Sequence, residues 1–230
     1  MLYAFDSSRN CVVFAYPNIC KRTYHSNTVE TSLSFLKAGG LLSRGVCEDL
    51  GYPQTPQKSD QLDKDFDIYY DLFFDSVDIH ERSHNANYYG SVLFEYDISI
   101  LDSIPEGCVR ITKSNPVNWN ANASENERYF TNECELEYCF TKGDFGQHIT
   151  IKAQNSPLSF IYLRRIIITN PCNNYMNYYA NAVNAIKQTI SDNNFDIVLE
   201  ERDCPDYCKC FDYYSNNHNV VNHYKLGGNQ

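Results

Sequence analysis

The sequence is short of positive charge and of tryptophan, and it has no long apolar run. The 230-residue chain carries 19 Lys and Arg against 29 Asp and Glu, which gives a formal net charge of -10. Broad, nonspecific phosphate binding needs neutralisation by lysine and arginine, so this balance argues against it while leaving room for a local basic groove. The paired basic residues Lys21-Arg22 and Arg164-Arg165 are candidate phosphate contacts, with plain surface as the alternative.

Two further absences concern location. The sequence has no apolar stretch of about 18 residues, so it offers no membrane span and no membrane partner is expected. Met1–Asp6 lacks a basic segment followed by a long apolar one, so we expect no secretory signal. A cytoplasmic protein with reduced thiols is therefore predicted, although ten cysteines could pair as disulfides if the chain were secreted.

The thiols are densest at Cys204, Cys208 and Cys210. These three could supply zinc ligands, with His218 or His223 as a fourth, but the Cys-x3-Cys-x-Cys spacing departs from the usual Cys-x2-Cys knuckle. Buried or incidental thiols are the alternative, so the sequence assigns no metal ligand. Residues 203–230 are expected to form a Cys- and Asn-rich tail that is mobile.

Aromatic residues are plentiful, since there are 19 Tyr and 13 Phe beside the single Trp. Aromatic side chains favour strands and can also stack on bases or nicotinamide. The alternating and apolar segments that predict strands are Cys11–Tyr16, Asp67–Phe74, Gly90–Asp97, Val109–Thr112, His148–Lys152, Leu163–Thr169 and Ile197–Leu199. The segments that predict helices are Thr31–Lys37, Arg128–Phe140 and Tyr175–Ser191, with a helical turn at Ile98–Leu101.

These elements do not alternate strictly, which predicts an α+β fold. Residues 1–22 are expected to form an N-terminal hairpin extension, residues 23–202 the main domain and residues 203–230 the tail. The polar segment Gly51–Lys64 contains Pro53 and Pro56 and is long enough for a lid or substrate loop.

The densest group of reactive side chains follows the aromatic strand. The run Phe73–Arg82 holds an acid, a base and a cation, and Asn87-Tyr88-Tyr89-Gly90 comes soon after. Scaffolds often present reactive groups in a polar turn after a strand. A solvated, charged loop is the alternative reading.

The segment Tyr24-His25-Ser26-Asn27, followed by Gly39-Gly40-Leu41-Leu42-Ser43-Arg44, resembles the opening of the DarT-type ADP-ribosyltransferases, which modify bases in single-stranded DNA. The order of elements continues to be similar through the strand before Asp75, Ser91–Asp97, Gly146–Ile151 and Ile161–Thr169, over roughly residues 23–202. The resemblance implies an ADP-ribosyltransferase-like split β-sheet with a few flanking helices.

The resemblance also implies site residues. His25 inherits the contact with the nicotinamide end of NAD, and Asn27 stands where the family has Thr. Arg44 is the only arginine between the Gly-Leu-Leu turn and the aromatic strand, and it lies earlier than the family's arginine. His148, with Gln147 beside it, occupies the position of the family's catalytic Glu.

Chemistry gives roles to the remaining polar groups. Loss of nicotinamide leaves positive charge on the ribose carbon, which Asp75 or Asp78 could stabilise. His80 or His148 could take the acceptor's proton, and Arg82 could bind the pyrophosphate. Asn87 could bind a ribose hydroxyl and Tyr89 could stack on a ring, and these two complete the predicted cofactor-binding residues.

The function predicted from these observations is NAD-dependent ADP-ribosylation of a nucleic-acid base by a toxin or antiphage effector. The expected partners are NAD, single-stranded nucleic acid and an antitoxin or other partner protein. Two alternatives stay open. A nuclease could cleave RNA with two histidines and an arginine, or could hold a divalent metal with Asp75, Asp78, His80 and His148. A non-catalytic acidic interaction module would fit the net charge.

Overall fold

Two small sheets form the framework of the fold. The computed structural model describes residues 20–152, 155–171, 176–204 and 207–227. The larger sheet has the order β1 (Arg22–Asn27), β4 (Val92–Asp97), β8 (Leu163–Thr169), β9 (Leu199–Arg202). Its pairs are antiparallel except β8 with β9, which is parallel.

The second sheet has the antiparallel order β3 (Leu72–Phe74), β6 (Ile149–Ile151), β5 (Val109–Ile111). It meets the larger sheet at one isolated bridge, where the Tyr24 and Asp75 backbones exchange hydrogen bonds of 2.9 and 2.8 Å. Beyond this bridge the two sheets diverge. The predicted α+β class with a split sheet is therefore confirmed. A further short pair joins β2 (Gly40–Leu41) to β7 (Leu158–Ser159).

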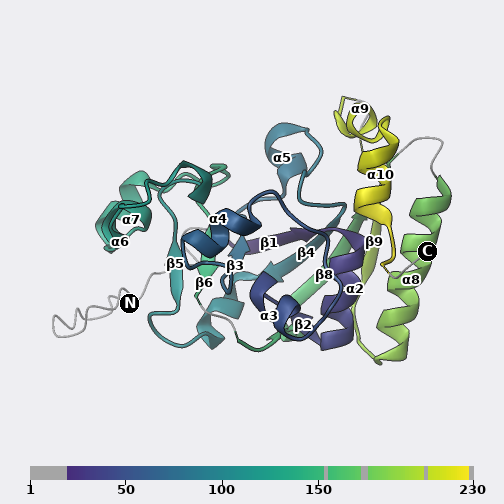
Figure 1. Ribbon diagram of the computed structural model, residues 1–230, viewed down its shortest axis with the longest axis horizontal. Helices are drawn as coiled ribbons and strands as arrows, with labels where there is room; N and C mark the ends of the chain where they lie inside the picture. The colour runs from purple at the N-terminus through teal and green to yellow at the C-terminus, as the bar shows by residue number, and fades with distance from the viewer. Residues whose placement is uncertain (1–19, 153–154, 172–175, 205–206, 228–230) are drawn as a thin grey trace.

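Helices lie at both ends of the sheets and also between those ends (Figure 1). One end carries α6 (Glu125–Arg128) and α7 (Glu133–Cys139), and the other carries α8 (Met176–Asp192) and α10 (Asn217–Tyr224). The other helices are α2 (Val29–Ala38), α3 (Arg44–Asp49), α4 (Asp60–Asp65), α5 (Ile79–Ser83) and α9 (Cys210–Tyr214). Three 3-10 helices are η1 (Ile98–Ser103), η2 (Pro116–Asn118) and η3 (Phe160–Tyr162).

Helix α2 illustrates how local sequence sets an element's limits. Thr28 caps its N-terminus by accepting a hydrogen bond from the Thr31 N–H. Gly39 ends it in the left-handed conformation, with φ 78°, and its N–H bonds back to Leu36. The predicted helix and its glycine stop are confirmed.

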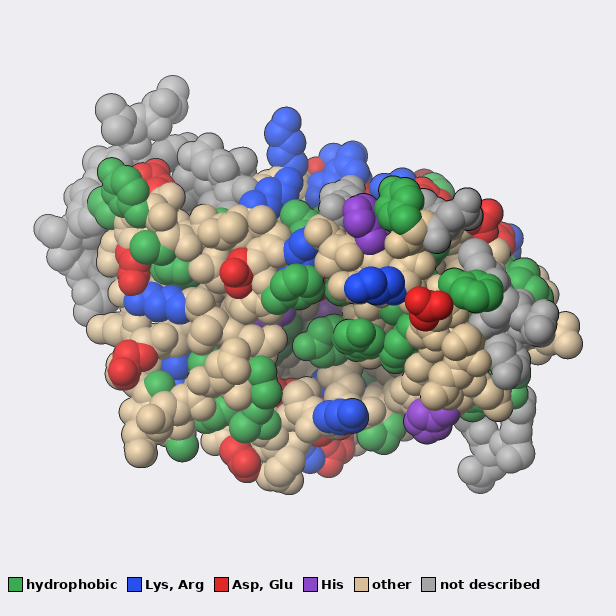
Figure 2. Space-filling view, turned by 90° about the horizontal axis from the view of Figure 1, so that it is seen from above, with side chains coloured by type: hydrophobic (Ala, Val, Ile, Leu, Met, Phe, Trp, Pro, Cys, Tyr) green, Lys and Arg blue, Asp and Glu red, His purple; other side chains and the backbone are tan. Residues whose placement is uncertain are grey.

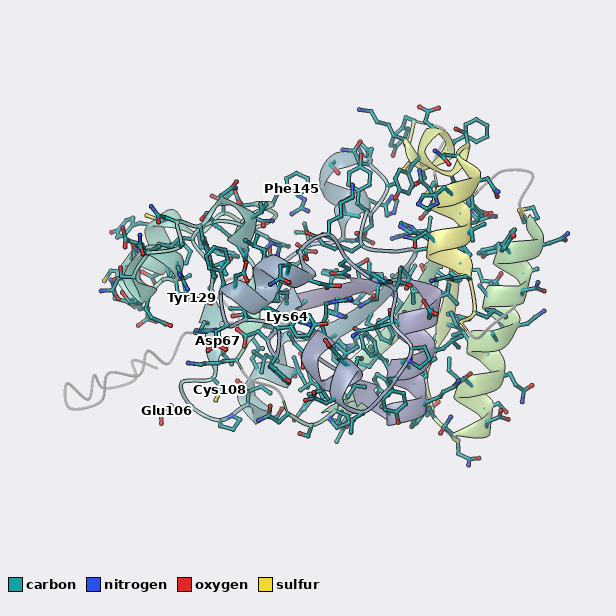
Figure 3. The ribbon with its side chains drawn as sticks, in the orientation of Figure 1. Lys64, Asp67, Glu106, Cys108, Tyr129 and Phe145 are labelled. Carbon is teal, nitrogen blue, oxygen red and sulfur yellow. The ribbon has the colours of Figure 1, made fainter. Side chains whose placement is uncertain are left out.

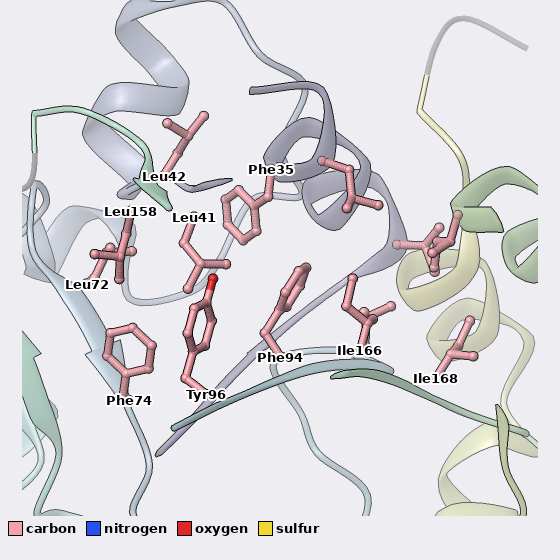
Figure 4. Packing of buried hydrophobic residues seen from close by; sticks show 14 of the residues in the cluster. Phe35, Leu41, Leu42, Leu72, Phe74, Phe94, Tyr96, Leu158, Ile166 and Ile168 are labelled. Carbon is pink, nitrogen blue, oxygen red and sulfur yellow. The ribbon is translucent and has the colours of Figure 1, made fainter. Parts of the chain in front are cut away.

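The main core lies between the larger sheet and the helices that cover it (Figure 4). Phe35 of α2 packs edge-on against Phe94 of β4, with ring centroids 5.8 Å apart. Phe74 of β3 contacts Tyr96 in the same way at 6.1 Å, so this core spans the split between the sheets. Burying each such side chain contributes about 1.5–3 kcal/mol, which holds the two sheets at a fixed angle.

Several predicted boundaries need correction. The expected strand Asp67–Phe74 starts only at Leu72, because Asp67 (Figure 3) is left-handed with φ 58° and the chain turns before the strand. The polar segment Gly51–Lys64 ends in α4, and the expected helix Arg128–Phe140 is shortened to α7. The hairpin strand Cys11–Tyr16 lies outside the described residues.

The C-terminal segment is not a mobile tail over the residues that the structure describes. Cys208, Cys210, Tyr214, Val220 and Tyr224 are buried in the main core. Helix α10 packs against both α2 and α8. The sequence-based expectation failed because the Asn-rich spacing hides a short amphipathic helix. Among the described residues, no helix has the length and apolar character needed to cross a membrane.

Candidate active site

A cavity of about 960 Å³ opens beside the split between the two sheets. This volume is at the upper end of the roughly 300–1,000 Å³ typical of small-molecule and cofactor sites. A hollow is visible in the middle of the face shown in Figure 2. Six residues predicted from the sequence line the cavity, which are His25, Asn27, Arg44, Asp75, Tyr89 and His148.

Strand β1 contributes His25 and Asn27. The His25 Nδ1 lies 2.8 Å from the Phe73 carbonyl oxygen, which only accepts, so Nδ1 carries the proton. The Asn27 amide nitrogen is 3.4 Å from the His25 Nε2. Burial lowers the pKa of His25, so the ring is neutral at pH 7. The two side chains form a fixed pair that can bind an amide by hydrogen bonds.

Asp75 and His148 face each other where the sheets separate. The His148 Nδ1 is 3.4 Å from the Asp75 Oδ1, and the two side chains are 11% and 20% exposed. His148 directly precedes β6, and its backbone N–H donates to the Thr112 hydroxyl at 2.8 Å. The ring of Phe73 contacts His148 edge-on at 6.0 Å. Both side chains are thus held by the ends of neighbouring strands.

Phe73 connects the two pairs. Its backbone carbonyl orients His25, and its ring contacts His148. The charge of Asp75 also acts on His25, opposing the lowering of its pKa. An acid and two imidazoles therefore share one small region of the cavity wall.

Two cations border the cavity on another side. Arg44, the first residue of α3, forms an ion pair with Asp60 and donates to the Thr55 carbonyl at 3.1 Å. Lys58 is exposed in the loop before α4 and also lines the cavity. The exposed Lys58 is better placed to meet a phosphate group, since Arg44 would have to exchange its ion pair with Asp60 for that contact.

The loop that carries Lys58 is anchored to α2. The Thr55 N–H donates to the Thr31 hydroxyl at 3.0 Å, and the Thr28 and Thr55 hydroxyl oxygens are 2.8 Å apart. The Ser34 hydroxyl donates to the Pro53 carbonyl at 2.5 Å. The predicted substrate loop therefore forms a wall of the cavity in a defined conformation.

The segment 87–90 supplies an aromatic wall. The Asn87 side chain accepts a hydrogen bond from the Tyr89 N–H at 3.0 Å, and so shapes the turn that presents Tyr89. Gly90 has φ 157°, and a Cβ there would stand 2.0 Å from the Asn27 carbonyl carbon. Only glycine allows this close approach of the turn to the end of β1.

Four site residues predicted from the sequence do not line the cavity in the part of the chain that the structure describes: Asp78, His80, Arg82 and Asn87. The buried Asp78 caps α5, accepting from the His80 N–H at 3.0 Å, and forms an ion pair with the partly exposed Arg202. The Arg82 guanidinium donates to the Gly143 carbonyl at 2.7 Å and stacks over Phe145, which lies beside α5 in Figure 3. Asp78 and Arg82 thus have their contacts outside the cavity lining, although the charge of Asp75 still acts on the Arg82 guanidinium.

The imidazole of His80 faces thiols. Its Nδ1 lies 3.9, 3.5 and 3.9 Å from the Cys204, Cys208 and Cys210 sulfurs. His223 is buried instead between Tyr213 and Tyr214, whose hydroxyls lie 3.3 and 3.1 Å from its ring nitrogens. His218 lines the cavity. The fourth side chain beside these thiols is therefore His80, and the suggestion of His218 or His223 is corrected.

The three arginines among the paired basic residues have carboxylate partners. Arg22 and Arg165 both contact the buried Glu95, at 2.5 and 2.8 Å. Arg164 pairs with Asp97 on the same sheet. These arginines therefore stabilise the larger sheet, which accounts for their charge without a phosphate ligand.

Sequence reasoning missed part of the lining. Lys58 and Thr55 come from the loop before α4, while Asn219 and Asn222 come from α10 and Tyr213 from α9. The polar loop was recognised as a substrate loop, but nothing in its composition distinguished Lys58. The C-terminal residues were overlooked because their segment was interpreted as a tail.

Comparison with known proteins shows a likeness to solved structures. No protein-family model matches the chain, and no curated protein matches it. The structure of Thermus sp. 2.9 DarT in complex with ADP-ribosylated ssDNA is 11% identical, with a TM-score of 0.49, covering 84% of this chain and 97% of that one. The same protein in complex with NAD+ is 10% identical, with a TM-score of 0.48, covering 79% and 95%. The solved structures that this chain is similar to are thus those of a DarT protein, the type that the sequence also resembles.

Proposed function

We propose that this chain is an NAD-dependent ADP-ribosyltransferase that modifies a nucleic-acid base. The observation that carries the proposal is the Asp75–His148 pair at the cavity wall, next to the fixed His25–Asn27 pair. NAD is the substrate class that the sequence resemblance implies, and the lining fits its parts. His25 and Asn27 suit the nicotinamide carboxamide, Tyr89 suits stacking, and Arg44 with Lys58 suits the pyrophosphate.

The Asp75–His148 pair offers the two functions that the usual glutamate combines. The Asp75 carboxylate stabilises the positive charge that develops on the ribose carbon as the nicotinamide leaves with the electrons of the broken bond. Its contact with Nδ1 favours the His148 tautomer whose Nε2 is free to accept a proton. When the acceptor base bonds to the ribose carbon, His148 takes the proton that the acceptor loses.

The nuclease alternative loses its proposed cluster. Its metal-dependent form required Asp75, Asp78, His80 and His148 to act together, and Asp78 and His80 have other partners. The remaining pair at the cavity suits proton transfer and charge stabilisation better than a two-metal or carboxylate-rich hydrolytic site.

The proposal is tested by titrating NAD into the full chain in a calorimeter, with nicotinamide release measured in parallel on mixed single-stranded DNA and RNA. Binding with release, abolished in His148→Ala and retained in the exposed-surface control Asp102→Asn, supports the transferase. Binding without release on any nucleic acid indicates a binding-only site. No NAD binding at millimolar concentrations would contradict the proposal and favour an acidic interaction module.

The biological setting that accompanies this chemistry is a toxin or antiphage effector acting in the cytoplasm and restrained by an antitoxin or other partner protein. Induced expression is then expected to arrest growth, and Asp75→Asn should relieve the arrest at equal protein level. Equal toxicity of both proteins would show that any growth effect is unrelated to this site.

A further inference from the structure

A second cluster of reactive side chains lies outside the cavity lining. His80, Cys204, Cys208 and Cys210 place one donor atom each within 4.8 Å of one another. Cys208 and Cys210 are 6% and 2% exposed, and the other two are partly buried. The cluster joins α5 to the start of α9, elements separated by more than a hundred residues in the chain.

The spacing of the donor atoms fits a tetrahedral metal ion. The His80 Nδ1 is 3.5–3.9 Å from all three sulfurs. With zinc–sulfur bonds of about 2.3 Å and zinc–nitrogen bonds of about 2.0–2.1 Å, a tetrahedron separates sulfur from nitrogen by about 3.6 Å. Small movements of the side chains would therefore bring all four donors to bonding distance from one point.

The surrounding structure fixes the donors from both sides. Asp78 caps the helix that carries His80 and pairs with Arg202, two residues before Cys204. On the other side, the Lys209 N–H donates to the His84 carbonyl at 2.9 Å. These contacts align the segments before and between the thiols with α5. Such supporting contacts are typical of metal sites.

We infer that His80, Cys204, Cys208 and Cys210 bind a structural zinc ion. Three thiolates and a neutral imidazole are soft and borderline ligands that select zinc over magnesium or calcium. Four protein ligands leave no open position for water or substrate, so this site is structural and not catalytic. Thiols that packed merely as small apolar groups would not require an imidazole nitrogen at their centre.

The ion would stabilise one wall of the cavity. Helix α5 leads into the segment with Tyr88 and Tyr89, and the thiols lead into α9 and α10 with Tyr213 and Asn222. The Tyr88 and Tyr213 rings already contact each other, with centroids 5.1 Å apart. Zinc would cross-link the two segments at their base and so hold this contact. This inference does not depend on which reaction the cavity performs.

The experiment uses the full chain, expressed with added zinc and purified with a phosphine reductant and without chelator. Elemental analysis is expected to give about one zinc ion per chain. Cys208→Ser should reduce the metal content to background, and the double variant Cys134→Ser, Cys139→Ser should retain it, because both of those cysteines are exposed on α7. Metal-free wild-type protein, or equal loss in the control variant, would overturn the inference.

A second measurement needs no variant and so covers the case in which Cys208→Ser fails to fold. Alkylation of the native protein, mapped by mass spectrometry, should modify Cys134 and Cys139 at once. Cys204, Cys208 and Cys210 should react only after a zinc chelator is added. If the chelator leaves their reactivity unchanged, no metal protects them and the inference is wrong. Cobalt(II) in place of zinc should give the visible bands of a tetrahedral thiolate complex.

Discussion

Replacing Asp75 by asparagine is the sharpest test of the proposed chemistry. The substitution keeps the size of the side chain and removes its charge. The backbone bonds of Asp75 to Tyr24 are unaffected, so the split sheet should persist. A loss of rate then reports the carboxylate charge together with its contact to the His148 Nδ1.

The expected magnitude follows from Coulomb's law. A full positive charge about 4 Å from the carboxylate, at an effective dielectric constant of about 20, is stabilised by about 4 kcal/mol. The Asp75 side chain is 20% exposed, and the ribose carbon carries only part of a full charge in the transition state. A loss of about 2–3 kcal/mol remains, which corresponds to roughly 30- to 150-fold in rate.

The assay is single-turnover nicotinamide release, with the NAD dissociation constant measured separately by calorimetry. The positive charge of NAD moves from the nicotinamide ring to the ribose carbon as the bond breaks, so Asp75→Asn should lower the rate by a larger factor than it weakens NAD binding. Asp102→Asn removes the same charge from an exposed position and should behave as wild type. A rate within threefold of wild type, or a parallel loss of NAD binding, would refute the role given to Asp75.

Three further substitutions test other parts of the structure. Burial raises the pKa of Asp63 to about 6, so the ionised carboxylate destabilises the fold increasingly as pH rises from about 4 to 6. Asp63→Asn should therefore stabilise the fold by about 1–2 kcal/mol at pH 7.5 and hardly at all at pH 4, measured by urea unfolding. Gly90→Ala should lower the free energy of unfolding by about 1–3 kcal/mol and weaken NAD binding. A Cβ at Gly51 would meet no atom within 4 Å, so Gly51→Ala should leave NAD binding intact. Asp78→Asn should cost about 1–3 kcal/mol in thermal unfolding, because Asp78 is buried while Arg202 is 20% exposed and keeps its bond to the Thr169 hydroxyl; no measurable loss would contradict that pairing.

Periodicity predicted the elements whose burial is strongest. Strand β8, Leu163–Thr169, was predicted with its observed limits, and α8 agrees within a residue over the part that the structure describes. Both elements carry several large apolar side chains facing the core, so the sequence pattern reflects their packing directly. Short elements with few buried side chains, such as α4 and α10, left no comparable pattern.

The cavity residues were predictable to the extent that they follow strands. Asp75 and His148 stand next to strands that the sequence pattern indicates, whereas the strand of His25 and Asn27 was implied by the resemblance alone. Their convergence depends on the split between the sheets, which the resemblance supplied and the spacing of residues did not. Lys58 could not be distinguished, because an exposed lysine in a polar loop is common.

The polar run after β3 was interpreted as a single site because its charges are close in sequence. A local signal pointed the other way, since Asp78 followed by Glu81 has the spacing of a helix N-cap and its third residue. Helix α5 starts there and redirects the chain. The partners of His80 are 124 to 130 residues away, and no local pattern could reveal them.

The short helix α5 therefore separates the side chains of the polar run Phe73–Arg82 into two groups with different contacts. Before it, Asp75 remains on the strand edge and faces the cavity with His148. Within it, Asp78 and His80 turn toward the C-terminal segment, where they meet Arg202 and the thiols. A cap is worth about 1 kcal/mol to a helix, which is small beside the interactions on either side of it. The position of the cap has a larger, geometric consequence. It separates Asp75, which faces the cavity, from Asp78 and His80, which contact the C-terminal segment.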